Sequence, residues 1–138
     1  MKISGWASGV LAAVAMCVTP YAAGAAGKFD GSAPLACALT DVHECAADAE
    51  CKRVSAGRVN LPPFVKVDIR AGKVHSESAG RESPFKSAQR LDGTLLLQGS
   101  ENERAWTMMI AETTGKMSAT ISAAEEGFVI FGSCMVLP

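Results

Sequence analysis

The sequence has no excess and no runs of charge of one sign. Its 13 basic and 14 acidic side chains are mixed along the chain without runs, and the formal net charge is −1. A face that binds nucleic acid needs clustered Lys and Arg to neutralise the phosphates. The charge pattern therefore predicts that neither DNA nor RNA is a partner.

Catalytic motifs are also scarce. The chain has two histidines, His43 and His75, and no Gly-x-Ser-x-Gly segment that would mark a nucleophile. His75 and Glu77 are two positions apart on an expected strand, so they project from the same face and could act as a general acid and base. Such pairs are more often solvent-facing side chains, and we therefore expect no catalytic residues. An enzyme that uses His43 or His75 is the alternative hypothesis.

Paired metal-binding motifs are lacking as well. His43, Cys45 and Cys51 are ligand types that bind zinc or copper, but no second close pair of ligands accompanies them. In an oxidising compartment the two cysteines are better explained as a disulfide. The sequence predicts no metal site and no cofactor.

Residues 1–26 have the three parts of a secretory signal peptide. Lys2 supplies the positive start, Val10–Val18 the apolar stretch, and Ala23–Ala26 the small residues at which a signal peptidase could cut. The apolar stretch is shorter than the roughly 20 residues that span a membrane, and the bulky Met16 before Cys17 argues against a lipoprotein. We expect export to the periplasm or the external medium, no membrane span after cleavage, and a single all-β domain over residues 27–138.

The cysteines outside the leader predict two disulfides. Cys37, Cys45, Cys51 and Cys134 allow three pairings. The short stretch Ala46–Glu50 suits a hairpin turn that would bring Cys45 opposite Cys51, which leaves Cys37 for Cys134. The second bridge would close nearly the whole exported chain into one loop and contribute on the order of 4 kcal/mol in the chain-entropy model.

From Leu35 onward, short apolar alternations are separated by turn residues, a pattern typical of an all-β sandwich or barrel. Long amphipathic helices are absent. The expected strands are Leu35–Cys45, Phe64–Arg70, Lys73–Ser78, Phe85–Leu91, Thr94–Gln98, Arg104–Ala111, Met117–Ser122 and Phe128–Met135. About eight strands with short connections predict a small antiparallel up-and-down meander that closes into a barrel. A Cys37–Cys134 bridge would then join the first strand to the last at the seam.

Irregular segments interrupt this pattern at two places. Gly80 and Ser83-Pro84 are predicted as a turn. Val54–Pro63 is predicted as a connector with one helical turn at Ser55–Val59, because Pro62-Pro63 cannot donate hydrogen bonds to a central ladder. The connector is expected to cross one end of the barrel.

Several apolar side chains could line a pocket in the barrel mouth, namely Trp106, Met108, Met109, Phe128, Ile130 and Phe131. A barrel of about eight strands has room for its side chains or at most one small ligand, so most of this set is expected to form the core. Trp106 lies just after a polar loop, near the end of its strand. It is the predicted ligand-binding residue.

Rigid cross-linked β scaffolds without catalytic constellations commonly act through their loops. The sequence therefore predicts a non-catalytic binding module that recognises a protein, a glycan or a small apolar molecule through Ala46–Glu50, Ser55–Pro63 and Gly99–Glu103. The alternative is an inhibitor or accessory subunit of a cell-envelope enzyme.

Four segments of the chain resemble small secreted β-proteins of Gram-negative bacteria, a resemblance that implies no particular activity. These segments are Asn60-Leu61-Pro62, Leu91-Asp92-Gly93, Thr114-Gly115-Lys116-Met117 and Gly127-Phe128-Val129-Ile130-Phe131-Gly132. The expected architecture is also similar to that of periplasmic lysozyme inhibitors, which is an analogy of fold alone.

Overall fold

The computed structural model describes residues 28–138, and the predicted signal peptide, residues 1–26, lies outside them. Within this range nine antiparallel strands form one sheet. The elements are β1 (Leu35–Ala46), β2 (Lys52–Val54), the 3-10 helix η1 (Ala56–Val59), β3 (Phe64–Asp68), β4 (Lys73–Ser76), β5 (Arg81–Leu91), β6 (Thr94–Glu101), β7 (Arg104–Ala111), β8 (Lys116–Ser122) and β9 (Glu126–Val136). No helix in residues 28–138 is long and apolar enough to cross a membrane.

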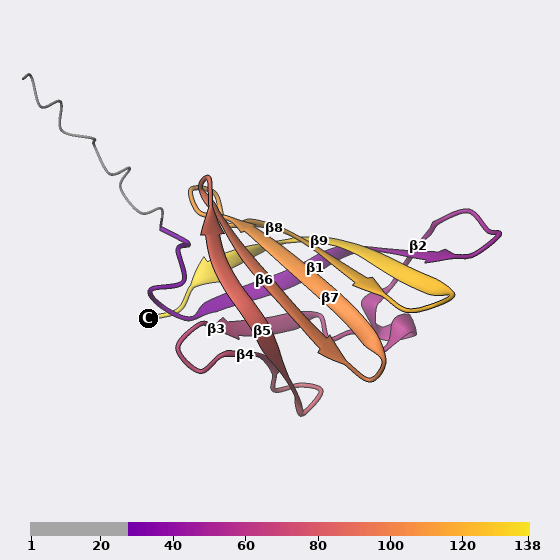
Figure 1. Cartoon of the computed structure of the whole chain (residues 1–138), viewed down its shortest axis with the longest axis horizontal. Coiled ribbons are helices and arrows are strands. Elements are labelled where there is room, and N and C mark those ends of the chain that lie inside the picture. Colours follow the sequence, from indigo (N-terminus) through magenta and orange to yellow (C-terminus); the bar gives the residue numbers. More distant parts are fainter. Residues whose placement is uncertain (1–27) are drawn as a thin grey trace, which may run out of the picture.

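The sheet closes on itself as the predicted meander barrel. Strands β3 to β9 are neighbours in chain order, β3 also pairs with β1, and β9 returns to pair with β1 along its length (Figure 1). Strand β2 lies outside this circuit, because it pairs only with the second half of β1. The closed circuit therefore holds eight of the nine strands.

Both predicted disulfides are confirmed. Cys37 and Cys134 are opposite each other in the β1–β9 register, with their Cα atoms 3.9 Å apart. Cys45 and Cys51 close the β1–β2 hairpin, whose turn places Asp48 at a positive φ of 62°. One bridge thus fastens the barrel seam, and the other fastens a hairpin that projects from it.

Burial alternates along β7 and β8, as the short apolar alternations of the sequence predict. Met108 and Ile110 of β7 and Met117 and Ala119 of β8 are buried, whereas the residue between each pair is more exposed. The largest fully buried apolar side chains come from β1, β3, β6 and β7: Leu35, Val42, Val67, Leu97 and Ile110. The core is therefore the barrel interior, as period-two patterning requires.

One end of the barrel is closed by residues near the start of the described chain. The ring of Phe29 is buried, and its backbone N–H donates to the Glu112 carbonyl at 2.9 Å. The buried carboxylate of Glu112 accepts two hydrogen bonds from Arg90, at 2.6 and 2.8 Å, which raise the pKa of that guanidinium. Gly31 lies against Ile69, where a Cβ would overlap the isoleucine side chain.

Two predicted strand boundaries were wrong at the opposite end of the barrel. Strand β5 begins at Arg81 rather than Phe85, so Ser83-Pro84 is strand and not turn, and β6 continues to Glu101. Pro84 is tolerated because the N–H of the next residue, Phe85, donates to Gly72 on the β4 side. The missing N–H of Pro84 therefore faces β6, where the β5–β6 ladder has already ended. Only Asn102 and Glu103, both at positive φ, turn the chain from β6 into β7.

Candidate functional site: a cavity at the open end of the barrel

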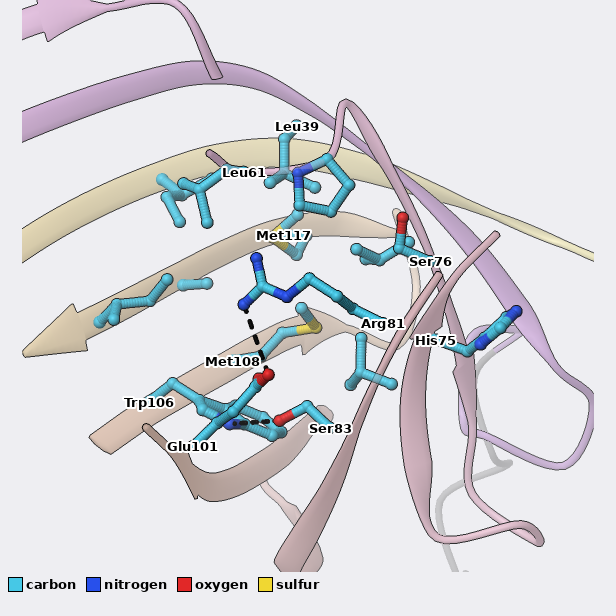
Figure 2. Close-up of a pocket in the computed structure, with 16 residues that line it drawn as sticks. Leu39, Leu61, His75, Ser76, Arg81, Ser83, Glu101, Trp106, Met108 and Met117 are labelled. Carbon is cyan, nitrogen blue, oxygen red and sulfur yellow. Dashed lines mark hydrogen bonds and ion pairs between the residues drawn. The ribbon is translucent and has the colours of Figure 1, made fainter. Parts of the chain in front are cut away.

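A cavity of about 110 Å³ lies inside the barrel at the end opposite Phe29 and opens to solvent. Each of the eight barrel strands contributes to its wall, as does the connector between η1 and β3 (Figure 2). The lining residues are Leu39, Leu61, Pro62, Val65, Val74, His75, Ser76, Arg81, Ser83, Glu101, Trp106, Met108, Met117, Ala119, Ile121 and Ile130. Most are apolar, and the polar ones come mainly from the ends of β4, β5 and β6.

The cavity exists because β5 and β6 separate. Their ladder ends at Phe85 opposite Gly99; beyond that point Arg81–Pro84 pairs with β4 and the end of β6 pairs with β7. Two side-chain contacts replace backbone hydrogen bonds here, one from β5 to β6 and one from β5 to β7. Arg81 Nη2 lies 3.5 Å from Glu101 Oε1, and Trp106 Nε1 donates to Ser83 Oγ at 3.0 Å.

Trp106 is held in one place on the cavity wall. Its indole crosses Gly99 so closely that a Cβ at that position would lie 2.5 Å from Trp106 Cε2, so glycine is required there. The hydrogen bond from Trp106 Nε1 to Ser83 fixes the orientation of the ring. The structure thus places the predicted ligand-binding residue on the cavity wall, and its role in binding remains a prediction.

Arg81 is a cavity residue that the sequence interpretation missed, because it was assigned to a turn. Its Nη1 donates to the carbonyl of Asn60 at 3.0 Å, so the side chain links β5 to the connector as well as to β6. Figure 2 shows it reaching across the cavity past Met108. The alternation of Arg81, Ser83 and Phe85 with the exposed Glu82 and Pro84 is the signal that could have revealed an earlier strand.

Two of the three predicted recognition segments reach the cavity. Ser55–Pro63 contributes Leu61 and Pro62, and Gly99–Glu103 contributes Glu101. The Ala46–Glu50 turn contributes no lining residue, because it lies at the tip of the β1–β2 hairpin, which extends away from the barrel (Figure 1).

His75 and Glu77, which the sequence offered as a possible acid–base pair, line a polar hollow together with Lys73 and Glu82. His43 is on the outer wall, where its ring packs edge-on against Phe131. The His75 ring points away from the cavity (Figure 2), and its Nδ1 lies 3.5 Å from Glu82 Oε1 without a hydrogen bond. Glu82 accepts a 2.6 Å hydrogen bond from Lys73, which lowers the pKa of that carboxyl group. Glu77 is in the turn after β4.

His43, Cys45 and Cys51 cannot act together as metal ligands, because Cys45 and Cys51 form the hairpin disulfide. Across residues 28–138, no group of three or more His, Cys, Asp or Glu side chains could hold a metal ion.

The geometry suits non-covalent binding of a small molecule, since apolar side chains form the walls and a few polar groups converge at the mouth. No family model, no curated protein and no solved structure matches the chain.

Proposed function

We propose that this protein is a non-catalytic binding module that holds a small, mainly apolar ligand in the open end of its barrel. The cavity carries this proposal: about 110 Å³ of space with mostly apolar walls lies at a barrel mouth. Eight-stranded barrels commonly hold one small ligand at this place. The dimensions compare with those of an engineered apolar cavity of about 150 Å³ that takes up benzene.

The frame around the cavity supports binding without reorganisation. Strand β1 is paired with β9 from Leu35 to Ala46, and the Cys37–Cys134 bridge lies within this seam. The bonds of Trp106 to Ser83 and of Arg81 to Asn60 hold two mouth residues in place. A preformed site loses less conformational entropy when a ligand binds.

The two disulfides are consistent with an oxidising environment. We therefore place this binding function in the periplasm or outside the cell, in accordance with the predicted signal peptide.

Fluorescence of Trp106 tests the proposal directly. The chain has two tryptophans, of which Trp6 lies in the predicted signal peptide and leaves with it. A Trp6→Phe protein also removes the emission of any unprocessed precursor, so the signal comes from Trp106 on the cavity wall alone. Titration with hexan-1-ol should change the Trp106 emission in a saturable manner and raise the midpoint of thermal unfolding, because a ligand that binds only the native state stabilises it.

A matched pair of variants on β8 tests whether hexan-1-ol binds inside the cavity. Ala119→Leu places a larger side chain into the cavity and should abolish the fluorescence change, whereas Thr120→Leu, the next residue on the outer face, should leave it intact. The circular dichroism of both variants verifies folding, and Ala119→Met replaces Ala119→Leu if the latter does not fold. The proposal fails if hexan-1-ol gives no saturable signal, or if the two variants bind it equally.

The alternative, an inhibitor or accessory subunit of an envelope enzyme, is favoured by a different surface. Phe64, Phe131 and Met135 are exposed on the outer faces of β3 and β9, on either side of the small residues Ala36 and Ala38 of β1. The alternative predicts that the wild type captures one stoichiometric envelope enzyme. A Phe131→Ser, Met135→Ser protein should lose this capture, whereas Ala119→Leu should retain it. That result would support the alternative over cavity binding.

A further inference from the structure

Arg81 is the cation at the mouth of the cavity. Its backbone belongs to the part of β5 that has left β6, and its side chain reaches across the opening towards Glu101 (Figure 2). Arg81 and Glu101 are the two residues with a full charge among those that line the cavity. A ligand that enters the mouth therefore meets this pair.

The contact between the two charges is loose. The 3.5 Å separation of Arg81 Nη2 and Glu101 Oε1 exceeds the 2.7–2.9 Å of a strong charge-assisted hydrogen bond. The side chains are 39% and 27% exposed, so water screens their attraction. Replacing this contact with a closer one therefore costs little.

The guanidinium also keeps donors available. It carries five N–H donors in a planar fork that matches a carboxylate. Within residues 28–138 its hydrogen bonds go to the Asn60 carbonyl through Nη1 and to Glu101 through Nη2. The bond to Asn60 holds the cation over the cavity, while the donors that face Glu101 are the ones a ligand can take.

We infer that the cavity selects small monocarboxylates: the apolar tail occupies the interior and the carboxylate displaces Glu101 from Arg81. This inference rests on the proposed binding function and adds the chemistry of the ligand. A cationic ligand would be repelled by Arg81, which its hydrogen bond to the Asn60 carbonyl holds over the cavity. A neutral ligand would gain the apolar contacts of the cavity but no ion pair.

The test compares three probes with the same six-carbon tail, namely hexanoate, hexan-1-ol and hexylammonium, by Trp106 fluorescence in the Trp6→Phe protein. Hexanoate should bind about tenfold more tightly than hexan-1-ol, as expected for a gained hydrogen bond to a charged group. Hexylammonium should bind most weakly. Added NaCl should weaken hexanoate binding and leave hexan-1-ol binding unchanged, because salt screens the ion pair.

Variants of Arg81 and Glu101 test whether these two residues cause the preference for hexanoate. Arg81→Met keeps the aliphatic lining and should weaken hexanoate binding about tenfold, while hexan-1-ol affinity stays within about twofold. Glu101→Gln removes the competing carboxylate and should tighten hexanoate binding. Lys86→Met removes an exposed cation from the same strand and is the matched control, with both affinities unchanged. Thermal unfolding verifies that the variants fold, and Arg81→Gln replaces Arg81→Met if needed.

The outcomes separate the two proposals. If none of the three probes binds the wild type, the cavity-binding function itself is refuted. If all three bind with equal affinity, or if Arg81→Met leaves the preference for hexanoate intact, the function stands and the carboxylate inference is overturned. Tightest binding of hexylammonium would also overturn it and would assign the mouth to cations through Glu101.

Discussion

Removal of the Cys37–Cys134 bridge should destabilise the barrel far more than removal of Cys45–Cys51. The perturbation is a pair of double variants, Cys37→Ala with Cys134→Ala and Cys45→Ala with Cys51→Ala, each of which keeps the other bridge. The bonded cysteines are 97 and 6 residues apart in sequence. A longer closed loop removes more conformational entropy from the unfolded chain, and the chain-entropy relation gives about 4.7 kcal/mol for the first bridge and about 2.2 kcal/mol for the second.

Packing makes the seam variant lose still more stability than the hairpin variant. Cys37 and Cys134 are buried in the barrel core, whereas Cys51 is exposed on the projecting hairpin. Alanine in place of the buried pair leaves a small cavity, which costs further stability. The loss for the seam bridge should therefore be at least about twice that for the hairpin bridge.

Urea unfolding followed by circular dichroism measures both losses. A loss of about 4.7 kcal/mol is a large share of the total of about 5–15 kcal/mol expected for a small domain. If the seam variant is unfolded without urea, an excluded osmolyte refolds it, and all three proteins are compared in that osmolyte. Equal losses, or a larger loss for the hairpin variant, would refute the reasoning that loop length decides the contribution of each bridge.

Two further substitution pairs test the packing of the barrel. Gly132→Ala should lower the free energy of unfolding by about 1–3 kcal/mol, because the new Cβ would overlap the Ala38 carbonyl across the seam. Gly57→Ala is the control, because a Cβ at Gly57 has no atom within 4 Å. It should leave stability unchanged or raise it by up to about 1 kcal/mol. Similar urea midpoints for these two proteins would contradict the close approach at the seam. Glu112→Ala should lower the free energy of unfolding by about 2 kcal/mol, because it removes the two hydrogen bonds from Arg90. Glu125→Ala, in an exposed turn, should change it by less than about 0.5 kcal/mol in the same thermal or urea experiment. A Glu112→Ala protein as stable as the wild type would show that the closed end does not depend on this buried carboxylate.

The sequence by itself determined the class of fold and the bridges. Alternation along β7 and β8 identified the inward-facing residues, because side chains of a strand point to opposite faces in turn. Asp92-Gly93, between the expected strands Phe85–Leu91 and Thr94–Gln98, is a pair typical of a hairpin turn, and both residues have positive φ in the structure. Cys45 and Cys51 were assignable because a short turn between them brings the strands together, and the remaining pair followed by elimination. Each of these features is local or follows from a count of cysteines.

The mouth of the cavity was decided only by tertiary structure. Ser83-Pro84 is typical of a turn when taken alone, yet Arg81–Pro84 is strand because β4 pairs with it. The place where β5 leaves β6 depends on how far each neighbour extends, and no local pattern encodes that length. This separation brings Arg81 to Glu101 and Ser83 to Trp106 across 20 and 23 residues of sequence. Periodicity could therefore predict that Trp106 faces inward, but only the closed barrel shows that it shares a cavity with Arg81.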